Sequence, residues 1–335
     1  MSTDQSYSCD FLIVGQGIAG TVLAHTLIGQ GKTVRVVDDW NYSSSSKVAA
    51  GLYNPIVFKR FTKSWMVDEL LPVAEKFYTD LEQILGEQLF YKKEIVKLFT
   101  EKGEKDLWLK KGEDEEQEKY LSGTVEHDFL TGHLNSENGA GFVKQAGNVD
   151  VKKMLTLFRA HLKKRHLIVE EKFNYAELQP NGDSVSYKEV HAKKIIFCEG
   201  FRATENPYFS WLPFKLTKGE ILTIKLSGGI IPDDKCINKG VFILPVGSDL
   251  YKVGATHNWN ELNEIPSEQG KNELIEKLNH ILKIPYQVIA HEAGVRPTVR
   301  DRRPLIGLHP KHSSIGIFNG MGTKGIMLAP YFAVH

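Results

Sequence analysis

The sequence predicts an α/β fold that combines a doubly wound (Rossmann-like) nucleotide-binding domain with a discontinuous, mostly antiparallel β-sheet domain. The first observation is a strand, a glycine-rich turn, a helix and a second strand within the first 40 residues, which is the order of a βαβ unit. The second is a β-rich stretch from about residue 213 to residue 260. Because α/β character returns near the C-terminus, we expect the β-rich part to interrupt the first domain.

The N-terminal βαβ unit carries the strongest motif. A buried-strand pattern at 11–14 runs into Gly15, Gly17 and Gly20, and a second strand ends at Asp38. Such glycines allow a sharp turn, a close approach of backbone to a pyrophosphate and tight packing of helix on strand. The acid at the end of the second strand can accept hydrogen bonds from two ribose hydroxyls and disfavours a 2′-phosphate, hence NADP. A glycine-rich turn without a ligand is the alternative interpretation.

The remaining elements follow from periodicity and turn residues. We expect a charged, solvated and partly helical excursion at 101–119, and an N-cap at Asp150. The other predicted elements are helices over 70–85, 151–162 and 274–281, strands over 193–198, 220–224, 241–244, 251–255 and 315–318, a hairpin turn at 247–249, and a final helix opened by the glycines of 320–325.

Composition excludes several classes of protein. The length of 335 residues allows two domains, and 41% hydrophobic with 25% charged residues can bury a large core. A net charge of +1 makes a dedicated nucleic-acid binder unlikely. Three scattered cysteines give neither a disulfide framework nor a zinc motif, and no ligand-like histidine spacing points to a metal. The N-terminus lacks a signal-peptide pattern, and no apolar run is long enough for a membrane span, so we expect a cytoplasmic protein.

Several further segments resemble one family, the FAD-dependent D-amino-acid oxidase/glycine oxidase superfamily. The resemblance covers nearly the whole chain, with two departures: Asp38 stands where Glu is commoner, and the chain ends ten residues after Gly325, where members usually continue their last helix, which indicates a shortened chain. The segments are 49–55, 147–150, 195–200, 294–301 with 304–307, and 320–325 with 329–330.

The resemblance implies FAD as cofactor, and we expect it to be noncovalent because no cysteine falls in the C-terminal flavin-facing motif. It also implies an FAD-binding domain of residues 1–86, 146–210 and 296–335, and a substrate domain of residues 87–145 and 211–295. The residues expected to bind FAD are Gly15, Gly17, Ile18, Ala19, Gly20, Asp38, Asp39, Ala50, Gly51, Leu52, Val149, Cys198, Gly200, Arg296, Gly320, Met321, Gly322, Thr323, Lys324 and Gly325.

Four residues are the candidates for the substrate site. Arg296 is expected to bind a substrate carboxylate through its planar guanidinium, which can make two parallel hydrogen bonds. Phe242 stands where relatives carry an aromatic residue near the substrate, and Tyr251 can add a hydroxyl. Lys252 aligns with the lysine that sarcosine-type oxidases use for oxygen activation, although a strand lysine is more often solvent-facing. The nearby Arg300, Arg302 and Arg303 are expected to be surface charges or partners of Asp301.

The predicted function is oxidation of a carboxylate-bearing amine, an amino acid or an N-substituted glycine. Hydride transfer to flavin N5 would give an imine that hydrolyses, and oxygen or another acceptor would reoxidise the flavin. One alternative is the FAD domain that removes carboxymethyl from a wobble uridine in tRNA, whose motifs are nearly as similar. The other is a flavin-binding protein without amine turnover.

Overall fold

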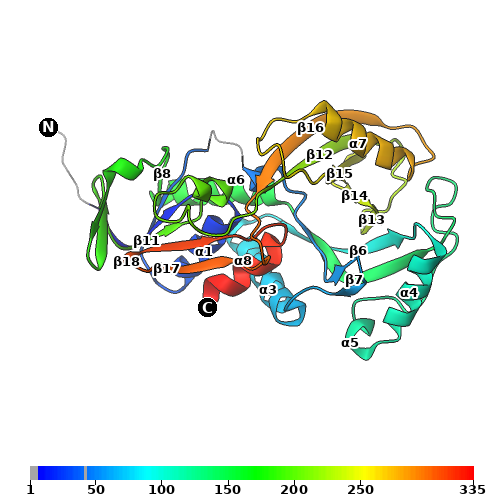
Figure 1. Cartoon of the computed structure of the whole chain (residues 1–335), viewed down its shortest axis with the longest axis horizontal. Coiled ribbons are helices and arrows are strands. Elements are labelled where there is room, and N and C mark those ends of the chain that lie inside the picture. Colours follow the sequence, from blue (N-terminus) through cyan, green and yellow to red (C-terminus); the bar gives the residue numbers. More distant parts are fainter. Residues whose placement is uncertain (1–6, 41–43) are drawn as a thin grey trace.

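The computed structural model describes residues 7–40 and 44–335. Residues 1–6, which belong to the polar N-terminus, and residues 41–43, which include Ser43, lie outside the described residues. Two eight-stranded sheets lie side by side and form the two lobes of Figure 1. A two-stranded hairpin, β4 (Ile56–Val57) with β5 (Thr62–Lys63), accompanies them. No helix in the described part of the chain is long and apolar enough to cross a membrane.

The first sheet is the doubly wound one. Its central strand β1 (Tyr7–Val14) pairs in parallel with β2 and β11, and β11 pairs in parallel with β18. Strands buried on both faces need continuous apolar sequence, and Leu12 and Ile13 are fully buried. The other strands are β2 (Val34–Val37), β8 (Ile168–Val169), β9 (Leu178–Asn181), β10 (Ser184–Tyr187), β11 (Val190–Phe197), β17 (Leu305–His309) and β18 (His312–Asn319).

Helices pack on this sheet and on one another. Asp150 caps α6 as expected, because its carboxylate accepts a hydrogen bond from the Lys153 N–H at 3.1 Å. The Tyr78 hydroxyl of α3 donates to the Ile326 carbonyl of α8 at 3.1 Å and so joins two segments far apart in sequence. The elements around this sheet are α1 (Ile18–Gly29), α2 (Ser45–Val48), α3 (Val67–Leu85), α6 (Val151–Lys164), α8 (Gly325–Val334), η1 (Tyr175–Glu177) and η2 (Gly200–Thr204).

The second sheet is antiparallel apart from the parallel pair β6–β13, as the sequence predicts. The turn at 247–249 joins β14 and β15 as the expected hairpin. Helix α7 (Glu268–Asn279) packs on one face of the sheet (Figure 1). The strands are, in spatial order, β16 (Gln287–Arg296), β12 (Thr217–Lys225), β15 (Leu250–Gly254), β14 (Val241–Pro245), β13 (Lys235–Lys239), β6 (Phe90–Leu98), β7 (Ala140–Val149) and β3 (Leu52–Tyr53).

The charged excursion is helical but less solvated than its composition suggests. It forms α4 (Lys102–Gly112) and α5 (Glu115–Glu118), and the Trp108 side chain of α4 is fully buried. The Trp108 indole donates to the Ser122 carbonyl at 3.0 Å and packs over Gly141, where a Cβ would lie 2.3 Å from the ring. One aromatic side chain therefore anchors an otherwise polar segment to β7.

Candidate active site

A cavity of about 1030 Å³ extends from the glycine turn after β1 to the face of the second sheet. Its walls come from segments of both sheets, so no single domain builds it. At one end lie the turn at 15–19 and the end of β2, and at the other lie Gly219, Phe242 and Arg296.

The glycine turn has the geometry of a phosphate cradle. Gly15 has φ +96°, and a Cβ there would lie 2.6 Å from the Cys198 carbonyl oxygen. A Cβ on Gly20 would lie 1.8 Å from the Gly15 carbonyl oxygen, so α1 could not pack against the turn with any larger residue. Gly17 lines the cavity at the start of α1, where the Ile18 N–H donates to the Ser46 hydroxyl at 3.1 Å, a bond that a phosphate oxygen can replace. Gly20 itself is buried behind the turn and does not line the cavity.

Asp38 lies where the ribose is expected. Its carboxylate accepts the Gln16 N–H at 2.7 Å and the Arg159 guanidinium at 2.8 Å. Arg159 is only 6% exposed and also pairs with Glu170. A carboxylate has about four acceptor sites, so one protein donor on each oxygen leaves room for two ribose hydroxyls. The sequence analysis missed Arg159. Its signal was a lone arginine on the apolar face of the 151–162 helix, because a buried arginine needs an acidic partner.

A second carboxyl group lies beside the phosphate cradle. Glu199 lines the cavity, and its carboxylate accepts hydrogen bonds from the Tyr175 hydroxyl and, at 2.7 Å, from the Asn206 amide. Burial raises the pKa of Glu199 to about 7, against the opposing effect of these two donors.

The expected flavin-facing segments are only partly exposed to the cavity. Ala50, Gly51, Leu52, Met321, Gly322, Thr323 and Gly325 line it, as do Ile18, Ala19, Asp39, Cys198 and Gly200.

Besides Gly20, three of the residues expected to bind FAD do not line the cavity, and their polar groups have partners within the protein. The Val149 N–H donates to the Gly51 carbonyl at 3.0 Å. The Gly320 N–H donates to the Asn319 side chain at 2.8 Å, and the Lys324 ammonium donates to the Ser64 hydroxyl at 2.9 Å. These residues support the lining segments from behind.

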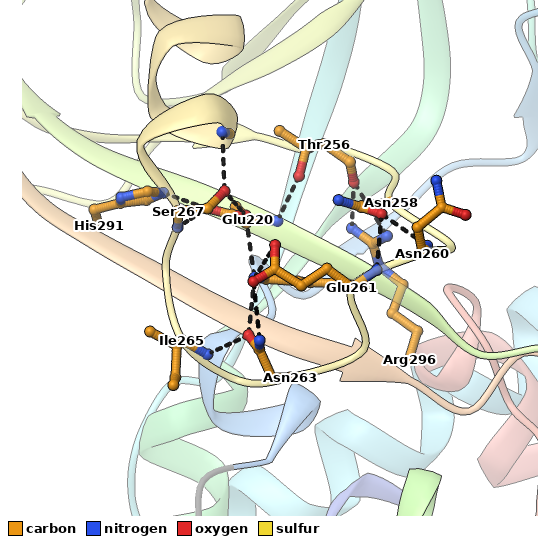
Figure 2. A network of polar contacts seen from close by, with 12 residues as sticks. Glu220, Thr256, Asn258, Asn260, Glu261, Asn263, Ile265, Ser267, His291 and Arg296 are labelled. Carbon is orange, nitrogen blue, oxygen red and sulfur yellow. Dashed lines mark hydrogen bonds and ion pairs between the residues drawn. The ribbon is translucent and has the colours of Figure 1, made fainter.

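Arg296 ends β16 and extends over Gly219 of the neighbouring strand. A Cβ on Gly219 would lie 1.8 Å from the Arg296 guanidinium, so glycine is the residue that leaves space for it. Both terminal nitrogens donate to the Thr256 carbonyl at 3.3 Å (Figure 2), and no acid pairs with Arg296 among the described residues. Burial lowers the pKa of Arg296 to about 10, which still leaves it charged at neutral pH. A half-buried cation with only a carbonyl partner is suited to a carboxylate ligand.

The hairpin residues lie on two different faces of the second sheet. Phe242 pairs with Gly254 and lines the cavity. Lys252 shares that face, donates to the Ala49 carbonyl at 3.4 Å and has its pKa lowered by burial, but it does not line the cavity.

The expectation for Tyr251 is wrong, because strand alternation places its side chain on the opposite face. It is buried there in the core that includes Leu274 and Leu278 of α7. Its hydroxyl therefore cannot reach a ligand in the cavity.

The loop after β15 contributes cavity residues that the sequence analysis missed. His257 and Trp259 line the cavity, and their rings lie 6.2 Å apart. Burial and the charge of Arg296 lower the pKa of His257, so its imidazole is neutral at pH 7 and can accept a proton or a hydrogen bond. No motif marks these residues, because their position depends on how the loop folds back over β12.

The thiols are poorly suited to covalent chemistry. Cys198 and Cys236 line the cavity, but both are buried, and burial raises the pKa of the Cys236 thiol to about 12. A neutral thiol is a weak nucleophile, which agrees with a noncovalently held flavin.

The site fits FAD, because it has a cradle for phosphate, a carboxylate at the ribose position and a long cavity that also contains a half-buried arginine. Comparison with known proteins agrees. A glycine oxidase from Pseudomonas aeruginosa is 23% identical over 345 residues, covering 95% of this chain and 91% of that protein. One from Bacillus subtilis is 26% identical over 237 residues, covering 67% of this chain and 59% of that protein.

Among solved structures, the glycine oxidase from Geobacillus kaustophilus superposes with a TM-score of 0.81 at 18% identity, covering 98% of this chain and 93% of that one. Residues 10–335 match the family described as DAO, FAD dependent oxidoreductase. The chain therefore belongs to the DAO family of FAD-dependent oxidoreductases.

Proposed function

We propose that this protein oxidises an amine that carries a carboxylate, either an amino acid or an N-substituted glycine. The observation that carries the proposal is Arg296, a half-buried guanidinium with no acidic partner among the described residues, in the same cavity as the phosphate cradle. Bound FAD would supply the two-electron acceptor for the C–H bond next to the amine. The glycine oxidases among the relatives support the same class of substrate.

The residues of this chain would bind and orient the substrate rather than cleave a bond themselves. Arg296 can exchange its 3.3 Å contacts with the Thr256 carbonyl for two shorter bonds to a carboxylate. Phe242 provides an apolar wall for the bound amine, and Trp259, which is 56% exposed, lies at the solvent side of the same cavity. The neutral imidazole of His257 can accept a proton from a substrate ammonium group, and a neutral amine is the form from which hydride is readily lost. The imine product would leave the cavity and hydrolyse in water.

The experiment measures anaerobic bleaching of the FAD-loaded protein by a series of amino acids and N-methyl amines, with wild type beside Arg296→Lys. Lysine keeps the charge but loses the planar pair of donors, so we expect kcat/KM to fall by about 10- to 100-fold. FAD content should stay at the wild-type level. Arg300→Lys is the matched control, because Arg300 is exposed and does not line the cavity.

A second variant, Gly219→Ala, tests the position of Arg296 without changing it. The added Cβ occupies the space of the guanidinium, so the loss should resemble that of Arg296→Lys. An amine without a carboxylate should be much less affected by either change. The proposal is contradicted if Arg296→Lys leaves turnover of every acid substrate intact, or if the flavin stays oxidised with every amine. The second result would favour a flavin-binding protein without amine turnover.

A further inference from the structure

The charged residues that line the cavity differ between its two ends. On the strand ends of the first sheet and on η1 and η2 both signs occur, with Asp38, Asp39, Glu171, Glu199 and Glu205 among them. Three other segments contribute basic side chains and no acid to the lining. They are the β4–β5 hairpin with Lys59, the loop after β15 with His257, and the end of β16 and the loop after it with Arg296 and Arg302. Neither Lys59 nor Arg302 forms an ion pair among the described residues.

Arg302 lines the cavity and has a left-handed backbone conformation, with φ +61°. Non-glycine residues in this conformation are uncommon and gather at binding sites. Of the two alternatives expected for Arg302, its exposure agrees with a surface charge, and no ion pair with Asp301 forms among the described residues; the Asp301 carboxylate accepts the Arg303 N–H at 3.0 Å. The Arg303 guanidinium lies 3.8 Å from the centre of the Trp65 ring, which holds this loop against the first lobe.

Positive charge gathers around this loop, where Arg300, Arg302 and Arg303 outnumber the single acid Asp301. Burial lowers the pKa of Lys324, and the nearby Arg302 and Arg303 lower it further. Lys324 donates to Ser64, and the Ser64 N–H donates to the Pro55 carbonyl at 2.7 Å. The hairpin that carries Lys59 is thus tied to the turn beside the Arg302 loop. Like charges that line the wall of one cavity raise the local concentration of anions.

We propose that Lys59 and Arg302 form a second anion subsite, and that the substrate carries a second anionic oxygen group besides the carboxylate held by Arg296. This inference rests on the proposed function, in which Arg296 binds the carboxylate next to the amine. Carboxylate and phosphonate or phosphate groups share the required chemistry, since both accept paired hydrogen bonds from a guanidinium. Both subsite residues are exposed in the free protein, so the second group would lie at the mouth of the cavity.

The test is a ligand-binding titration, followed by the absorbance of the bound flavin under anaerobic conditions. The probes are glycine with one anionic group, iminodiacetate with a second carboxylate, and N-(phosphonomethyl)glycine with a phosphonate. The variants are Lys59→Gln and Arg302→Gln, alone and combined. Arg60→Gln is the matched control, because Arg60 is exposed next to Lys59 but does not line the cavity.

We expect each subsite variant to raise the Kd of at least one dianionic probe by about 5- to 30-fold and that of glycine by less than about twofold. The dianionic probe whose Kd rises more in the Lys59 and Arg302 variants identifies the second anionic group as a carboxylate or a phosphonate. The dianion affinity of wild type should also fall more steeply with added salt than that of the double variant.

Equal losses for glycine and the dianions, or no loss with either variant, would overturn the second subsite. So would tRNA binding that requires both residues while the small dianions bind unchanged. Binding is read from the rapid spectral shift that precedes bleaching, so a failure of the proposed oxidation would show as a flavin that stays oxidised while the Kd comparison still tests the subsite.

Discussion

Glu199 is the residue whose environment most changes its chemistry. Glu199 lines the cavity, and a Cβ on Gly15 would lie 3.4 Å from the Glu199 Cα, so its backbone packs against the phosphate cradle. Burial raises its pKa from the ordinary value of 4.5 to about 7, while the two hydrogen-bond donors limit the rise. A neutral carboxyl group here would avoid repulsion with a bound pyrophosphate.

This shift predicts a pH dependence of folding stability in the protein without cofactor. The folded protein holds the Glu199 proton more tightly than the unfolded chain. The contribution of Glu199 to the free energy of unfolding is therefore fully present below about pH 4.5. It is lost as the pH rises to about 7. Glu199 alone can change the free energy of unfolding by at most about 1.4 kcal/mol per pH unit. Glu199→Gln should remove that slope, measured as the difference between the two proteins in urea unfolding at pH 5, 6, 7 and 8. Parallel curves would show that Glu199 titrates normally.

At the scale of elements, β12 serves two purposes through its two faces. Gly219 and Ile221 face the cavity, whereas Lys218 and Glu220 face the loop from Thr256 to Ser267. Lys218 is 0% exposed and Glu220 is 1% exposed. The Lys218 ammonium donates to Asn263 at 2.9 Å and lies 3.6 Å from the Glu220 carboxylate.

Glu220 is the centre of the network in Figure 2. It accepts the Ser267 hydroxyl at 2.7 Å and lies 2.7 Å from the His291 ring nitrogen. Its own N–H donates to the Thr256 hydroxyl at 3.0 Å, and the Thr256 carbonyl in turn accepts both Arg296 donors. The loop that carries His257 and Trp259 is therefore fixed at both ends by a single strand.

Removing one member of the buried pair should destabilise the protein strongly. Lys218→Met leaves the Glu220 charge buried with fewer partners, and we expect a loss of about 3–5 kcal/mol in the free energy of unfolding. Lys218→Met combined with Glu220→Leu should recover part of this loss, because no uncompensated charge remains. Urea unfolding of the two single variants and the double variant measures the coupling. Additive losses would mean that the two charges do not depend on each other.

At the scale of the whole molecule, the cavity lies between segments of both sheets, so its ligand should stabilise the entire fold. FAD at 100 times its Kd adds about 2.7 kcal/mol to the free energy of unfolding, which should raise the Tm by several degrees. ADP offers the same phosphates and ribose and should also raise the Tm, by less, and compete with FAD. NADP should give no shift, because its 2′-phosphate would meet Asp38. A rise in Tm with NADP equal to that with ADP would contradict the assignment of Asp38 to the ribose of the bound nucleotide.

Much of the cofactor end could be predicted from the sequence, because its signals are local. The strand at 11–14, the glycines of the turn and the acid after the second strand lie within 40 residues, and each has a backbone or hydrogen-bonding requirement that residue type reveals. The N-cap at Asp150 and the hairpin turn at 247–249 are equally local. The strands β6, β7, β16 and β17 were not predicted, since their partners are distant in sequence and their patterns are weak.

The sequence by itself thus determined the fold class, the phosphate cradle and Arg296 as a candidate ligand for a carboxylate. Only the tertiary structure decided which face of β15 meets the cavity, and so separated Tyr251 from Lys252 and Phe242. It also decided that Arg159 neutralises Asp38 and that Arg302 lines the cavity rather than pairing with Asp301. These outcomes depend on which distant segments pack together, and burial and charge pairing arise only from that packing.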